Sequence, residues 1–149
     1  MNGRRPLAVL VVGLVPWTVL FYPGGQEVYF AYGLLTHAGV FHSLPAYLSM
    51  AVPDFLPFSS VFSILPERLL AWPASTGLWV LSLASVVLGS HEDRRVTDGL
   101  LAIAGLSQFV FAIGFWTSEG YLALPIGGVL LVALAWWDRR SHRADVGQR

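Results

Sequence analysis

The sequence contains no cysteine and no lysine, and it has few charged residues of any kind. Without cysteine, the chain can form neither disulfides nor thiolate metal sites, and it has no cysteine nucleophile. Charged residues make up 12% of the chain, whereas soluble domains have about 25%. Because 55% of the residues are hydrophobic, too few polar side chains are present to cover a water-soluble surface. The composition therefore predicts an integral membrane protein whose first partner is the lipid bilayer.

The whole-chain charge is balanced, with nine basic and nine acidic residues. Nucleic-acid-binding proteins usually carry a basic excess that attracts phosphates. We therefore expect no nucleic-acid partner.

Four long apolar stretches predict transmembrane helices, for which about 20 residues are needed to cross the hydrocarbon core. They are residues 6–23, 73–90, 97–116 and 121–137. Short polar turns separate the last three. The predicted fold is all-α: four transmembrane helices in an antiparallel bundle, forming one membrane domain over residues 1–149.

The first stretch contains Pro16, whose ring removes a backbone amide and leaves the carbonyl of Val12 without its helical partner. This predicts a kink in the first span. The basic start followed by apolar residues also resembles a signal peptide. No small-residue cleavage pattern follows it, so we expect a retained span.

Residues 24–72 lie between the first two spans and carry repeated prolines, which exclude an uninterrupted helix of about 20 residues. These prolines are Pro45, Pro53, Pro57 and Pro66, with Pro73 directly after. Residues 27–32 favour β-structure, and short helices are expected near 46–52 and 67–72. We predict an irregular, proline-rich outer segment that caps the bundle or lies in the interface. A re-entrant pair of half-spans remains the alternative.

The arginines set the expected orientation. With four crossings, eight of the nine fall on one side of the membrane, namely Arg4, Arg5, Arg94, Arg95, Arg139, Arg140, Arg143 and Arg149. Short cytoplasmic loops carry an excess of basic residues. We therefore expect a plasma-membrane protein with both termini cytoplasmic and with residues 138–149 as a polar cytoplasmic tail.

The densest charged cluster lies in the turn between the second and third spans and contains Glu92, Asp93, Arg94 and Arg95. It begins like a metalloprotease motif after His91, but the required second histidine is missing. We interpret it as a topological anchor. Glu92 and Asp93 are expected to pair with the terminal arginines in an ion-paired ring that closes the inner end of the bundle.

Gln108 is the deepest polar residue of the predicted spans. An amide in this position costs free energy unless another helix supplies a hydrogen-bond partner. Ala104 and Ala112 share its helix face, which favours a close-packed interhelical contact. The alternative is a group lining a pore or ligand path.

The sequence has no catalytic motif. His37 and His42 are the only histidines of the outer segment, with Glu27, Asp54 and Glu67 as possible carboxylate neighbours. A spacing of five residues directs the two imidazoles to different faces of a helix or strand. We therefore expect no catalytic residue, no metal site, no cofactor and no enzymatic activity.

Several segments resemble a family of uncharacterised small multi-pass membrane proteins from halophilic archaea. They are Val15-Pro16-Trp17, Leu70-Ala71-Trp72-Pro73, the turn from Glu92 to Leu101, Leu124-Pro125-Ile126-Gly127 and Ala135-Trp136-Trp137. The resemblance implies a multi-pass protein of the cell membrane and brings no assigned activity.

The sequence thus leads to two functional hypotheses. The first is a structural or accessory component of a membrane complex, with a membrane-protein partner or a second copy of the chain. The alternative is a small transporter or channel for a small or lipophilic solute, in which Gln108 and Pro16 line the path.

Overall fold

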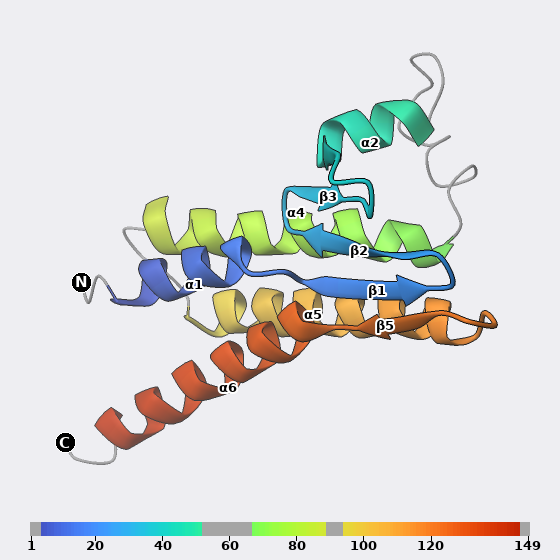
Figure 1. Cartoon of the computed structure of the whole chain (residues 1–149). Helices are drawn as coiled ribbons and strands as arrows, with labels where there is room; N and C mark the ends of the chain where they lie inside the picture. The colour runs from blue at the N-terminus through green and yellow to red at the C-terminus, as the bar shows by residue number, and fades with distance from the viewer. Residues whose placement is uncertain (1–3, 52–66, 89–93, 147–149) are drawn as a thin grey trace.

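The computed structural model describes residues 4–51, 67–88 and 94–146. Long helices lie side by side, and a five-stranded antiparallel sheet lies beside one end of them (Figure 1). The elements in chain order are α1 (Arg4–Leu14), β1 (Thr18–Tyr22), β2 (Gly25–Phe30), β3 (Gly33–Leu35), β4 (Phe41–Ser43), α2 (Leu44–Ala51), α4 (Glu67–Leu88), α5 (Arg94–Trp116), β5 (Leu122–Leu124) and α6 (Ile126–Val146). The order of strands in the sheet is β4-β3-β2-β1-β5.

The prediction of an all-α bundle with four transmembrane helices is wrong, because the described residues form an α+β fold with a five-stranded sheet. Only two helices in this part of the chain are long and apolar enough to cross a membrane, at Leu69–Leu88 and Arg94–Trp116. The first and fourth predicted spans are each part helix and part strand. Hydropathy failed to separate these cases because a buried strand and a buried helix can be equally apolar.

In the first predicted span, Pro16 ends the helix instead of bending it. α1 stops at Leu14, and the backbone becomes extended from Thr18. The carbonyl of Val12 accepts a hydrogen bond of 2.9 Å from the indole of Trp17. β1 has the sequence TVLFY, and its β-branched and aromatic side chains suit a pleated surface.

The fourth predicted span is divided in the same way. β5 covers Leu122–Leu124, Pro125 follows, and α6 begins at Ile126. Proline is favoured at a helix start, where its missing amide costs nothing. α6 then continues to Val146, so the tail expected from residue 138 is largely helical.

The prediction of an irregular segment over residues 24–72 is wrong for residues 25–43, which form β2, β3 and β4. β1 and β2 are joined through Pro23 and Gly24, and Gly24 has a φ of 115°. Proline followed by a glycine with positive φ is the pattern of a type II turn. The short helix expected near residues 46–52 is present as α2, whereas Pro73 lies inside α4 and not at its start.

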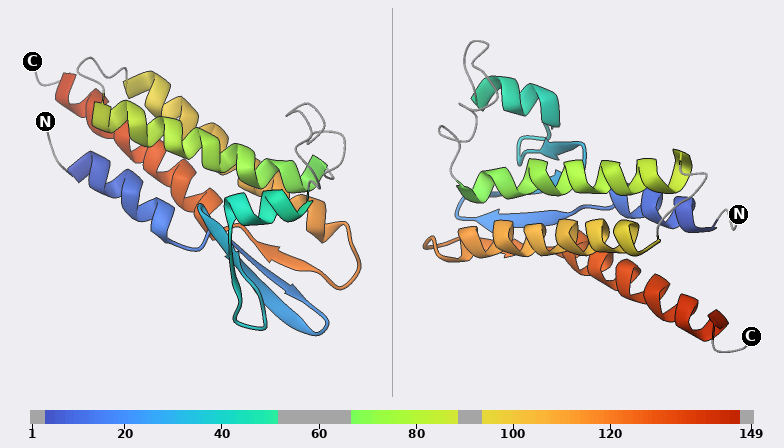
Figure 2. Two further views of the ribbon diagram at one scale, coloured as in Figure 1. Left: turned by 90° about the horizontal axis from the view of Figure 1, so that it is seen from above. Right: turned by 180° about the vertical axis from the view of Figure 1, so that it is seen from behind.

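The chain runs along the molecule four times, as α1 with β1, then α4, then α5, then β5 with α6. Both termini consequently lie at the same end (Figures 1 and 2). α5 and α6 approach closely at Gly105, where an added Cβ would lie 2.8 Å from the carbonyl oxygen of Gly128. One group of buried side chains surrounds Trp17 near the middle of the molecule, and a second surrounds Trp72 and Phe111 beside the sheet.

Candidate functional site

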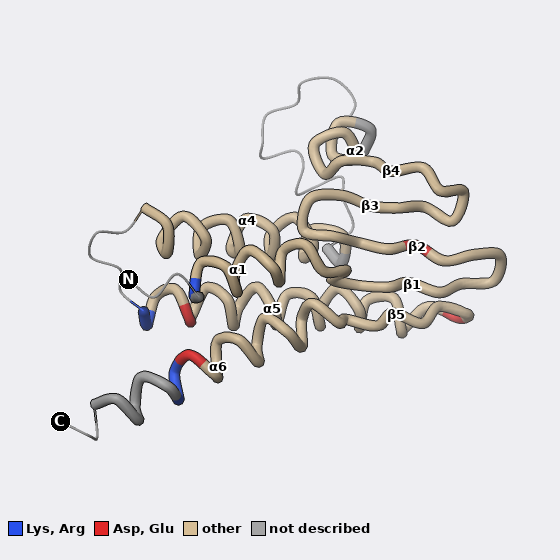
Figure 3. The backbone as a smooth tube through the Cα atoms, turned by 60° about the vertical axis from the view of Figure 1, so that its left-hand side comes forward, with Lys and Arg blue, Asp and Glu red and all other residues tan. Residues whose placement is uncertain are grey.

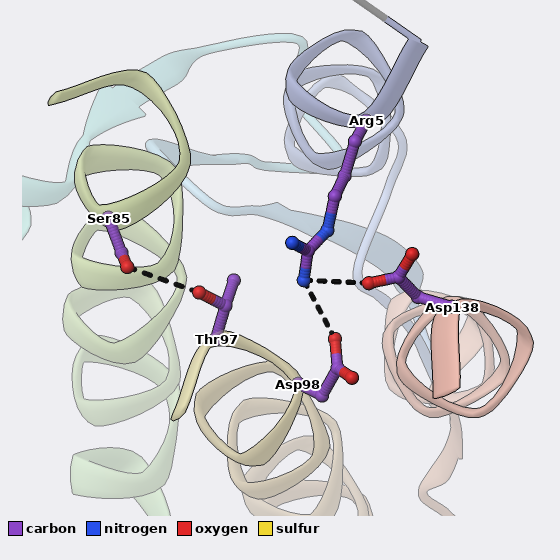
Figure 4. Close-up of polar contacts among 5 residues, drawn as sticks. All are labelled: Arg5, Ser85, Thr97, Asp98 and Asp138. Atoms are coloured by element: carbon purple, nitrogen blue, oxygen red, sulfur yellow. Dashed lines mark hydrogen bonds and ion pairs between the residues drawn. The ribbon is translucent and has the colours of Figure 1, made fainter. Parts of the chain in front are cut away.

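Arg5 joins three helices at the end where the termini lie (Figure 4). Its Nη2 atom is 3.0 Å from Oδ1 of Asp98 and 2.7 Å from Oδ2 of Asp138. The three residues come from α1, α5 and α6. Beside them, the hydroxyls of Ser85 and Thr97 are 3.1 Å apart and connect α4 to α5. We call these five residues the terminal cluster.

The terminal cluster places two carboxylates around one guanidinium. Only 14% of the Arg5 side chain is exposed, and the Asp98 and Asp138 side chains are 6% and 21% exposed. Charged groups withdrawn from water need close partners of opposite sign. Arg5 supplies that partner to both acids and so holds the start of α1 against α5 and α6.

The ion-paired ring predicted from the sequence contains Glu92 and Asp93 as its acids. Glu92 and Asp93 lie outside the described residues, and Arg94 and Arg95 are exposed at the start of α5. The acids that pair with Arg5 are Asp98 and Asp138. Sequence reasoning missed Asp98 because it assigned this residue to a helix N-terminus at Thr97, whereas α5 starts one turn earlier, at Arg94.

A central cluster surrounds Gln108, whose side chain is fully buried. Thr18 on β1 donates a hydrogen bond of 2.9 Å to Oε1 of Gln108. Nε2 of Gln108 donates to the hydroxyl of Ser75 on α4, and that hydroxyl donates to the Trp72 carbonyl at 2.7 Å. The amide therefore has partners on both sides and connects α5, β1 and α4.

Pro16 is not part of the central cluster. It lies in the link between α1 and β1, directly before Trp17. The backbone amide of Trp17 donates to the Tyr29 carbonyl at 2.7 Å, and its carbonyl accepts from Gly127 at 2.9 Å. Pro16 thus fixes the point at which the chain changes from helix to strand.

A third group, the tyrosine cluster, lies at the opposite end of the molecule from the termini. Glu27 accepts hydrogen bonds from the hydroxyls of Tyr22 and Tyr29, at 3.4 and 3.0 Å. The Tyr22 oxygen is 3.2 Å from Nδ1 of His37. Glu27 therefore joins two tyrosines of neighbouring strands, and Tyr22 links it to His37.

The tyrosine cluster contains only part of the constellation considered from the sequence. His37 is near Glu27 through Tyr22, whereas His42 lies on β4, opposite Leu34. Asp54 lies outside the described residues. Among the described residues, no three histidine, aspartate or glutamate side chains are grouped as metal ligands. No sequence pattern pointed to the tyrosines, because only the register of β1 and β2 brings them to Glu27.

Comparison with known protein families finds one match. Residues 2–146 match a family described as a domain of unknown function, DUF8050. The chain belongs to the DUF8050 family. No curated protein matches it. The matched range includes every described helix and strand, so the terminal, central and tyrosine clusters all belong to the DUF8050 domain.

Proposed function

We propose that this protein is an integral membrane protein that serves as a structural or accessory component of a membrane complex. The observation that carries the proposal is the distribution of charge. In the described structure, charged residues gather at the end with the termini and, toward the opposite end, on β2 of the sheet and in the turn before β5, and the helices between these positions are apolar (Figure 3). We call this apolar region the belt. An apolar region between two charged ends is what the hydrocarbon core of a bilayer requires of a protein that crosses it.

The length of the belt supports this location. The apolar part of α4, Leu69–Leu88, contains 20 residues, which corresponds to about 30 Å at 1.5 Å per residue. The hydrocarbon core is also about 30 Å thick. The helices expose large apolar side chains over this length, including Val80, Leu81, Val87, Ile103, Leu106, Val110, Ile113, Val129 and Leu130.

The charges at each end support one orientation. The start of α1, the start of α5 and the last part of α6 lie at the end with the termini and carry Arg5, Arg94, Arg95, Arg139 and Arg140 together with Asp98 and Asp138. Glu27 on β2 and Glu119 after α5 lie toward the opposite end. Basic residues favour the cytoplasmic side. We accordingly place the terminal cluster at the cytoplasmic face of the plasma membrane. The half of the apolar region that is farther from this cluster then lies in the outer half of the membrane.

The bonding of Gln108 favours a structural role over the transporter alternative. A group that lines a solute path must present its polar atoms to that path. Gln108 is fully buried and bonded to Thr18 and Ser75. It would have to break both contacts to meet a solute, so the central cluster is better suited to hold three elements together.

Two experiments on the same membrane preparation test the proposal. Extraction with alkaline carbonate should leave the protein in the membrane pellet, and its recovery in the supernatant would contradict the membrane location. Purification in mild detergent, with mass spectrometry of co-purifying proteins, should give a reproducible membrane-protein partner or a stable oligomer. A protein that runs alone, without neighbours in native cells, would contradict the accessory role.

The transporter alternative is tested in proteoliposomes. We expect no solute flux above that of empty liposomes. Flux that is present in the native protein and lost in Gln108→Leu would replace our proposal with the alternative.

A further inference from the structure

One face of the sheet packs on the helices. No described helix packs on the other face, which we call the open face, and it is mainly apolar, with Gln26 and Ser43 as its polar side chains. On the packed face, Thr18, Leu20, Tyr29 and Leu34 are buried. On the open face, the strand register forms a continuous row across all five strands: Leu124, Val19, Val28, Leu35 and Phe41. Residues directly opposite one another in neighbouring strands share a face. This row is apolar at every position.

The open face is also exposed at both ends of the row. Leu124 is 41% exposed and Phe41 is 47% exposed. Beside the row, Phe21 lies between Leu122, which is 53% exposed, and the exposed Gln26. The described strand residues on this face include no charged side chain. A soluble antiparallel sheet with one packed face normally has polar residues on the other, so water is a poor environment for this one.

Three contacts fix the position of the sheet along the helices. Thr18 at the start of β1 bonds to Gln108, and the indole of Trp116 donates to the Ala123 carbonyl at 2.7 Å. Between them, the rings of Tyr29 and Phe111 are 5.0 Å apart. The sheet therefore lies beside the segment of α5 from Gln108 to Trp116. This segment is the outer half of the proposed span.

The backbone of the strands nearest the helices is suited to the same depth. Hydrocarbon does not supply hydrogen bonds, so a sheet in the bilayer must satisfy its own polar groups. β1, β2 and β3 are each paired on both sides, whereas β4 is an edge strand paired only with β3 and followed directly by α2. At the β5 edge, the carbonyl of Ala123 accepts the bond from Trp116.

We infer that the inner part of the sheet, up to the level of Glu27, lies within the outer leaflet and that lipid acyl chains cover its open face. This inference rests on the proposed membrane location, because it uses α5 as the depth scale. The open face is continuous along the chain with exposed apolar residues of α1 and α6, through Leu14 before β1 and Ile126 after β5. The helices and the sheet would then present one surface to lipid.

Spin labels can test the inference directly, because the chain has no cysteine of its own. Single cysteines are introduced as Leu124→Cys and Phe41→Cys on the open face, with Val110→Cys on α5 as the membrane reference. Val96→Cys, exposed in the first turn of α5, is the aqueous reference. Each labelled protein is placed in phosphatidylcholine liposomes, and its collisions with oxygen and with a water-soluble nickel chelate are compared.

Labels at Leu124 and Phe41 should collide with oxygen more than with the nickel chelate, as the label at Val110 does. The inference is overturned if they resemble the label at Val96 while Val110 remains in lipid. It is also overturned if dipolar broadening at Leu124 or Phe41 shows that a second copy covers the face. A water-exposed label at Val110 would instead contradict the proposed membrane location itself.

Discussion

Thr18 on β1 donates a hydrogen bond of 2.9 Å to the side chain of Gln108 on α5, at a site that is fully buried. This contact joins residues 90 positions apart. It lies where the first passage of the chain changes from helix to strand. We expect it to stabilise the junction between the helical part of the protein and the sheet.

Replacing Gln108 by leucine should lower the free energy of unfolding by about 1–2 kcal/mol. The substitution keeps the apolar volume and leaves the Thr18 hydroxyl without its acceptor. The effect is measured by thermal unfolding in detergent. Ser107→Ala is the matched control, because among the described residues that hydroxyl donates within its own helix, to the carbonyl of Ile103. Equal stability of both variants would contradict a structural role for Gln108.

The second prediction concerns the contribution of the terminal cluster to stability. Arg5→Gln should destabilise the protein by about 2–3 kcal/mol, because Asp98 and Asp138 lose their shared cation and repel one another. Asp138→Asn in the same chain should recover part of the loss by removing one of the two negative charges. The measurement is the midpoint of thermal unfolding for the single and double variants.

Arg94→Gln is the control for Arg5, since Arg94 is an exposed arginine at the same end of the molecule. It should change the midpoint little. If Arg94→Gln and Arg5→Gln have the same effect, net charge and not the ion pairs determines stability.

The third prediction concerns the close packing of α5 against α6. An added Cβ at Gly105 would lie 2.7 Å from a methyl of Val132 and 2.8 Å from the Gly128 carbonyl oxygen. Gly105→Ala should therefore cost about 1–3 kcal/mol through overpacking. Gly77 on α4 has nothing within 4 Å of such an atom, so Gly77→Ala should be neutral or stabilise the protein by up to about 1 kcal/mol. The opposite ranking of the two variants in unfolding experiments would contradict this packing.

Sequence reasoning located α5 within three residues and α4 within six residues at its start, because each is a long apolar stretch. It also found a short helix near α2 and β-prone residues at β2. It assigned the segments around Pro16 and Pro125 to continuous helices, since hydropathy records burial and not backbone conformation. The pairing of β1 with both β2 and β5 depends on contacts far apart in the chain, which local patterns do not encode.

The candidate sites were predicted unevenly for the same reason. Gln108 was identified because a lone amide in an apolar helix needs a partner. Its partners, Thr18 and Ser75, follow from the tertiary fold. Arg5 was expected to form ion pairs, but Asp98 and Asp138 were not named as its acids. The tyrosines around Glu27 could not be found before the register of β1 and β2 was known.

In the proposed arrangement, α4 and α5 cross a membrane with the terminal cluster on the cytoplasmic side. The most direct test is labelling of Val96→Cys and Thr117→Cys, two exposed positions at opposite ends of α5, with a membrane-impermeant maleimide in intact cells. We expect Thr117→Cys to be labelled at once and Val96→Cys to be labelled only after permeabilisation. Equal labelling of both positions before permeabilisation would contradict it.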